Sequence, residues 1–248
     1  MEEQLWKACS EGKVEEVIKL LQNEQVYINW QNQNDHLKTP FYCACQKGKV
    51  EIVKLLLNDQ RVDVNKPNKY DQTSFYVACG NGHIDIVKLL LNDTKVDANK
   101  ADKYGWTPFY VACYRGDIKT VKLLLNDNRI DINKANNDGW TPFYVACQEG
   151  DIAIVQILLN DNRVDINKPN NFGETPFLIA YSNGKTEVLK YLLASGRVDI
   201  NKAGANRKND LDYTRENGKK DIVESIESFQ KRTEDEPKSI FNYLFYFL

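Results

Sequence analysis

Cysteine and histidine are two residue types in this chain that could support nucleophilic or metal chemistry. The chain has six cysteines and two histidines. Cys79 and His83 are four residues apart, and a cysteine beside a histidine can form an activated nucleophile. The run Gly80-Asn81-Gly82 between them is typical of a helix end, which does not hold two such side chains together. We therefore do not expect a catalytic pair.

Other ligand-binding motifs are incomplete. The Gly80-Asn81-Gly82 run lacks the lysine and serine that follow the glycines of a phosphate-binding loop. Asp127, Asp131 and Asp138 lack the terminal glutamate of a calcium loop. We predict no catalytic residue, no metal site and no cofactor, so the chain is not expected to be an enzyme.

Composition excludes several further classes. The 248 residues, 42% hydrophobic and 27% charged, can bury a core as one or two domains. Lys and Arg number 33 against 35 Asp and Glu, so the net charge of -2 lacks the basic excess that favours nucleic acid. Nucleic acid is therefore not expected as a partner.

The ends of the chain and its cysteines bear on location. The N-terminus, Met-Glu-Glu-Gln, has no apolar run, and six cysteines fit reduced thiols. We expect a cytoplasmic location, with the nucleus as the alternative. The longest strongly apolar stretch, Ile240 to Leu248, is far below the roughly 20 residues that a membrane-spanning helix needs, so no transmembrane segment is expected.

A repeat of 34 residues organises the chain. The sequence WTPFYVAC occurs unchanged at residues 106–113 and 140–147, and TPFYCAC occupies residues 39–45. Five units share this frame, a first unit has a connection two residues longer, and a last unit is degenerate. The predicted boundaries are 1–36 (an N-terminal cap), 37–71, 72–105, 106–139, 140–173, 174–207, 208–232 (a C-terminal cap) and 233–248, an acidic linker with a hydrophobic tail.

Each unit is predicted to contain two short helices and an extended finger. In the unit that starts at Trp106, Thr107 and Pro108 are typical of a helix start, and Gly116 is typical of a helix end. Asp117 can cap a second helix, whose apolar residues 118, 121, 124 and 125 lie on one face. Residues 129–133 alternate in an extended finger that leads to the turn Asp138-Gly139.

These residues resemble the ankyrin repeat. The resemblance covers roughly residues 4 to 230 and implies an all-α solenoid of stacked helix-turn-helix units with β-turn fingers. One departure is that tyrosine replaces the histidine of the family's Thr-Pro-Leu-His at positions 42, 76, 110 and 144, and leucine replaces it at 178. The hydrogen bonds at this column must therefore differ.

The cysteines and His83 have a structural interpretation under this resemblance. Cys9, Cys45, Cys79, Cys113 and Cys147 share a column where the family usually has alanine, and His83 occupies an ordinary Gly-His position. We expect these cysteines to be small buried hydrophobic residues. Stacked helices lie roughly 8–10 Å apart, which is too far for disulfides between neighbours.

The resemblance implies that the chain is a protein-protein interaction module, a scaffold or adaptor that binds its partner on a concave surface of fingers and first helices. Tyr, Trp and Arg dominate binding hot spots, and they concentrate in the middle units. The predicted partner-binding residues are Tyr70, Lys103, Tyr104, Trp106, Tyr114, Arg115, Trp140 and Phe172. The alternative for Trp106 and Trp140 is that they only pack along neighbouring fingers.

Other functions remain open at this point. The repeats could be the targeting arm of a larger enzyme or signalling protein. The tail could make the chain a peripheral membrane adaptor, although one short apolar segment anchors weakly. Self-association through Phe241–Leu248 is a third hypothesis, and packing of this tail on the last repeat is the simplest alternative.

Overall fold

The computed structural model describes residues 1–199 and residue 224. The helices named within this part of the chain are α1 (Glu2–Glu11), α2 (Val14–Leu21), α3 (Pro40–Gln46), α4 (Val50–Leu57), α5 (Ser74–Gly80), α6 (Ile84–Asn92), α7 (Pro108–Tyr114), α8 (Ile118–Leu125), α9 (Pro142–Glu149), α10 (Ile152–Leu159), α11 (Pro176–Ser182) and α12 (Thr186–Ala194). The described residues contain no strand, only an isolated bridge between Asn32 and Lys38. The tail at 233–248, and the last predicted unit except Glu224, lie outside them.

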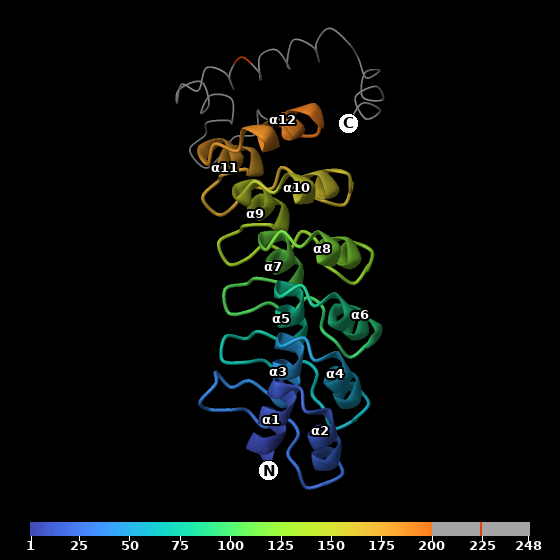
Figure 1. Cartoon of the computed structure of the whole chain (residues 1–248). Helices are drawn as coiled ribbons and strands as arrows, with labels where there is room; N and C mark the ends of the chain where they lie inside the picture. The colour runs from blue at the N-terminus through green and yellow to red at the C-terminus, as the bar shows by residue number, and fades with distance from the viewer. Residues whose placement is uncertain (200–223, 225–248) are drawn as a thin grey trace. The chain divides into compact units, whose positions relative to one another are not determined.

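The chain divides into two compact units, Met1–Pro142 and Phe143–Leu248. In the first unit, α1, α3, α5 and α7 pack in one row, and α2, α4, α6 and α8 form a second row beside it (Figure 1). The loops that join successive pairs project as fingers from the first row, on the side away from the second (Figure 1). In the second unit, α12 packs against α10 and α11.

Local sequence determines where the first helix of a pair begins. Thr39, Thr73, Thr107 and Thr175 each precede such a helix, and each side chain accepts a hydrogen bond from the amide three residues later. The second helix α8 begins after Asp117, whose carboxylate accepts from the amides of Lys119 and Thr120. The predicted helix starts at Thr107 and Asp117 are therefore confirmed, and Gly116 has a φ of 68° between the two helices.

Small and large residues alternate in the core. Ala44, Ala78 and Ala112 are fully buried on the first helices, where their small side chains let neighbouring helices approach. The phenylalanines of the same helices are also buried, at positions 41, 75 and 109. Burial of one such ring stabilises the fold by roughly 1.5–3 kcal/mol, so stacking supplies the core that a single pair lacks.

The tyrosine column joins the first helices α3 and α5 to the finger that follows each of them. The Tyr42 hydroxyl donates to Gln72 Oε1 (3.4 Å) and accepts from Asn68 Nδ2 (3.1 Å). The Tyr76 hydroxyl donates to Asp102 Oδ2 at 3.3 Å. These hydrogen bonds fix the base of the fingers that follow α3 and α5. That they differ from the bonds of the family's usual histidine stays a prediction.

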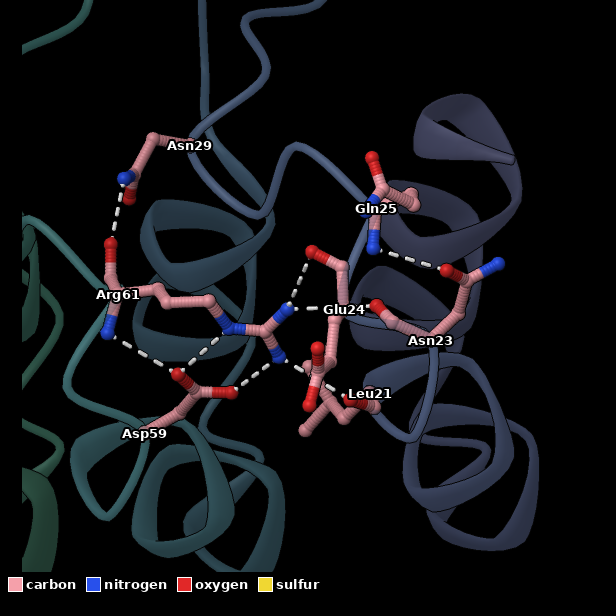
Figure 2. Close-up of polar contacts among 7 residues, drawn as sticks. All are labelled: Leu21, Asn23, Glu24, Gln25, Asn29, Asp59 and Arg61. Atoms are coloured by element: carbon pink, nitrogen blue, oxygen red, sulfur yellow. Dashed lines mark hydrogen bonds and ion pairs between the residues drawn. The ribbon is translucent and has the colours of Figure 1, made fainter.

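Arginines at the start of some fingers bind the preceding helix pair. Figure 2 shows Arg61 donating to the carbonyl oxygens of Leu21 (3.0 Å), Asn23 (3.3 Å) and Glu24 (3.3 Å) at the end of α2. Asp59 orients this guanidinium, with 2.6 Å between Nη2 and Oδ2. The guanidinium thus satisfies carbonyl groups that the helix end leaves open.

Candidate functional site

Hydrogen bonds fix the backbone of the finger that carries Tyr104 and Trp106. The buried Asp102 carboxylate accepts hydrogen bonds through Oδ1 from the amides of Tyr104 (2.9 Å) and Trp106 (3.0 Å). The Asp102 amide donates to the Trp106 carbonyl at 3.0 Å, and Gly105 takes a φ of 82° in the turn between them. The backbone that carries Tyr104 and Trp106 is therefore held on both sides of the turn.

Adjacent fingers are tied together at their tips. In each pair, a backbone amide donates to a carbonyl of the preceding finger at 2.9–3.0 Å: Lys69 to His36, Lys103 to Tyr70, and Asn137 to Tyr104. These bonds fix the register of the fingers in the first unit. As a result, residues 36, 70 and 104 follow one another along a row.

Lysine ammonium groups lie over the tyrosine rings of this row. Lys103 Nζ is 4.7 Å from the Tyr70 ring centroid and 4.8 Å from that of Tyr104. Lys69 Nζ is 4.9 Å from the Tyr70 centroid. All three distances are within the range of cation-π attraction, so Lys103 joins the rings of two fingers. The ring of His36 extends the row, 5.5 Å from Tyr70.

Trp106 connects the finger row to the first helix of its own pair. Its ring centroid lies 6.3 Å from that of Tyr104, 5.3 Å from Tyr110 and 5.6 Å from Tyr114. Tyr114 is the last residue of α7, and the Arg115 guanidinium lies 5.8 Å from its ring. Aromatic contact thus runs from a fingertip to a helix end.

We call this set of residues the aromatic-basic surface. Its members are His36, Lys69, Tyr70, Lys103, Tyr104, Trp106, Tyr114 and Arg115. Tyr104 is 55% exposed and Tyr114 is 37% exposed. Tyrosine, tryptophan and arginine, which all occur in this set, are the residue types that protein interfaces favour.

Six of the eight predicted binding residues belong to the aromatic-basic surface: Tyr70, Lys103, Tyr104, Trp106, Tyr114 and Arg115. Trp140 lies in the next finger, where its amide donates to Asn136 Oδ1 at 2.9 Å and its side chain is half-buried. Phe172 lies on a finger of the second unit, 64% exposed. The Trp106 ring contacts Tyr104 of its own finger and Tyr110 and Tyr114 of α7, so these contacts do not test the alternative that it packs along neighbouring fingers.

The prediction missed His36 and did not single out Lys69 for binding. His36 precedes Tyr70 by 34 residues, so the repeat period itself was a usable signal. The first unit has a longer connection, and His36 falls at its predicted end, so the match between His36 and Tyr70 was not recognised. In the structure His36 has a positive φ of 54°.

The cysteines and His83, which were considered for catalysis or metal binding, contribute to packing and to contacts between helix pairs. All six cysteines are free and buried, which confirms the expectation for this column. Burial raises the pKa of Cys79 well above its ordinary value, so the neutral thiol is favoured. His83 Nε2 lies 3.0 Å from the Gln46 carbonyl oxygen, a contact between neighbouring pairs.

The described residues hold no group of three or more His, Cys, Asp or Glu side chains arranged to bind a metal ion. No helix among them has the length and apolarity to cross a membrane.

Comparison with known proteins places the chain in a family. A family model described as ankyrin repeats (3 copies) matches residues 5–102 and 94–170, and one described as ankyrin repeat matches 172–202. The chain therefore belongs to the ankyrin repeat family, whose members are generally protein-protein interaction modules and typically non-enzymatic.

The chain is similar to the crystal structure of the ankyrin repeat domain of Bcl-3, described as a unique member of the IkappaB protein family. The TM-score is 0.79 at 21% identity, covering 89% of this chain and 96% of that one, a likeness that shows the fold. No curated protein matches the chain.

Proposed function

We propose that this chain is a non-enzymatic scaffold or adaptor that binds a protein partner through the aromatic-basic surface. The observation that carries the proposal is the continuous contact from Tyr70 through Lys103 and Tyr104 to Trp106 and Tyr114. Backbone hydrogen bonds already join the fingers of this surface in the free protein. Binding a partner therefore costs little conformational entropy.

The proposal also includes partner contacts by Trp140 and Phe172, and a cellular location. Trp140 would contact the partner from the finger after Tyr104, and Phe172 would contact a partner from the second unit in its own right. A cytoplasmic location, with the nucleus as the alternative, fits the free state of all six thiols.

Affinity capture from a cell lysate tests the proposal. The baits are the wild-type chain, Tyr104→Ala/Tyr114→Ala, and Tyr27→Ala. Tyr27 is a matched control because it is 54% exposed and has Lys66 Nζ 5.6 Å from its ring, but it is not part of the surface. Mass spectrometry reads the captured proteins, and thermal melting checks that each bait is folded.

We expect the wild type and Tyr27→Ala to capture the same protein in equal amounts. The double variant Tyr104→Ala/Tyr114→Ala should not capture this protein. If the folded double variant captures the same proteins as the wild type, the surface is not the binding site and the proposal fails.

A further inference from the structure

We infer that the partner segment on the aromatic-basic surface is acidic, and that the Lys103 ammonium binds one of its carboxylates. This inference rests on the proposed function and adds the chemistry of the partner. The occupant to which it commits is an Asp- or Glu-containing segment of a separate protein, with an apolar residue next to the acidic one.

The charge of the aromatic-basic surface favours an acidic partner segment. Lys69, Lys103 and Arg115 supply three cations, and within the described part of the chain none lies within ion-pair distance of a carboxylate. By contrast, the acidic group of the first finger, Asp35, is paired with Lys38 at 2.9 Å. Asp102 is buried with its carboxylate turned to the backbone of its own finger.

Two acidic residues lie on these fingers or on the next one along the chain. Asp71 and Asp138 are both exposed, one residue after Tyr70 and one after Asn137. Three cations against these two carboxylates leave the surface weakly basic in a chain whose net charge is -2. Selectivity for an acidic segment therefore depends on one well-placed cation more than on the overall field.

Lys103 is that cation, because its ammonium is held before a ligand binds. Two tyrosine rings lie within 4.8 Å of Nζ. Its backbone is fixed at both polar groups, since the amide donates to Tyr70 and the carbonyl accepts from Asn137 Nδ2 at 3.0 Å. A lysine normally loses much side-chain freedom when it binds, and here part of that loss has already occurred.

The Lys103 ammonium can still donate hydrogen bonds to a carboxylate. Aromatic faces attract the charge of an ammonium without accepting its hydrogens as strong hydrogen-bond acceptors do, so N-H donors remain for a carboxylate. A charge-assisted hydrogen bond of this kind is roughly twice as strong as one between neutral groups. Trp106 and Tyr114 supply apolar area next to it for a neighbouring apolar side chain.

The experiment uses the full chain and a phage library that displays random 12-residue peptides. Selections are run on the wild type, on Lys103→Met, and on Lys119→Met as the matched control. Methionine keeps the aliphatic stem, and Lys119 is an exposed lysine on α8 that is not a member of the aromatic-basic surface. Circular dichroism and thermal melting confirm folding, and fluorescence anisotropy then measures the affinity of the most enriched peptides.

We expect wild-type selections to be enriched in Asp and Glu next to apolar residues, relative to the unselected library. Affinity for these peptides should fall about tenfold in Lys103→Met and less than about twofold in Lys119→Met. Selections without acidic enrichment, selections that yield no binder, or an affinity unchanged in folded Lys103→Met each overturn the inference.

Two further probes separate other occupants. A 12-nucleotide oligo(dT) that binds more tightly than the peptides, and depends on Lys103, would overturn the inference in favour of a nucleic acid. The second probe is a peptide with the sequence of residues 233–248, which contains Glu234, Asp235 and Glu236. If this peptide binds more tightly than the selected peptides and its binding depends on Lys103, the inference is overturned in favour of a segment of this chain. Lysate capture that still depends on Tyr104 and Tyr114 would leave the proposed function intact in every case.

Discussion

Tyr76 and Tyr42 occupy the same column of the repeat, but their hydroxyls have different partners. Tyr76 donates to the buried carboxylate of Asp102, whereas Tyr42 shares the side chains of Asn68 and Gln72. Asn68 Nδ2 also donates to Gln72 Oε1 at 3.1 Å, so these two amides retain a partner when Tyr42 is changed.

This difference predicts unequal costs for the same substitution. Tyr76→Phe removes the hydroxyl from a buried charged oxygen and should cost about 1.5–3 kcal/mol, whereas Tyr42→Phe should cost about 0.5–1.5 kcal/mol. Urea denaturation of both variants measures these free energies of unfolding. Equal costs would contradict the role assigned to the Asp102 carboxylate.

The buried thiols predict a decrease in stability at alkaline pH. Burial raises the pKa of Cys9, Cys43, Cys45, Cys79 and Cys147 above the ordinary value of 9.0, that of Cys43 to about 12. Thiols of the unfolded chain ionise first, so this stabilisation is complete below the ordinary value and is lost as the pH rises toward the folded pKa.

Cys43→Val tests this loss while keeping the packing, because valine stands at the same column in Val77 and Val111. We expect the free energy of unfolding to fall less steeply above about pH 9 in the variant than in the wild type. An identical slope for the two proteins would show that Cys43 does not contribute.

At the scale of elements, the arginine column joins one helix pair to the next. Arg61 and Arg129 both donate to carbonyl oxygens of the preceding second helix, Leu21 of α2 and Leu91 of α6. In the second unit, Arg197 does the same to the carbonyl of Leu159 in α10. Lys95 replaces arginine at this column, and its ammonium instead donates to the Gln60 side chain at 2.9 Å.

Lys95→Arg should therefore stabilise the protein. A guanidinium at position 95 can pair with Asp93 and reach the end of α4, as Arg61 pairs with Asp59 and reaches the end of α2. Because these groups are partly exposed, we expect a gain of about 0.5–1 kcal/mol, or about 1–4 °C in the melting temperature. Lys119→Arg is the control. A melting temperature that does not rise would contradict the role of this column.

The same column predicts sensitivity to acid. Hydrogen bonding from Arg61 lowers the pKa of Asp59 below its ordinary value of 3.8, and Arg129 does the same for Asp127. A lowered folded pKa gives stability that is present above the ordinary value and is lost as the pH falls through the folded pKa. Stability should thus decline below about pH 4, less steeply in Asp59→Asn, as followed by circular dichroism. Parallel acid transitions would argue against this pairing.

At the scale of the whole molecule, the sequence predicted most of the fold, because the signals are local and recur. A threonine before a helix and a glycine after it act within a few residues, and the 34-residue frame repeats them. The division into two compact units was not predicted, since the repeat frame continues unchanged through residue 142.

The site was predictable in composition but not in geometry. Residue types and the repeat frame indicated Tyr104, Trp106 and Tyr114, but the position of Lys103 between two rings depends on backbone hydrogen bonds between fingers. No pattern within one unit contains that information. The asparagine side chains that join fingers were also not predicted: Asn65 donates to the Lys95 carbonyl at 2.6 Å and accepts from the Asp97 amide at 2.8 Å.

The most direct test of the central claim, that the aromatic-basic surface contacts a protein partner, is site-specific photo-cross-linking. A photoreactive benzoyl-phenylalanine replaces Tyr104 in one full-length protein and the equally exposed Tyr27 in another. We predict that irradiation in lysate gives a covalent adduct to a discrete protein from position 104 and none from position 27. Adducts from position 27 alone, or the same adducts from both positions, would contradict the claim.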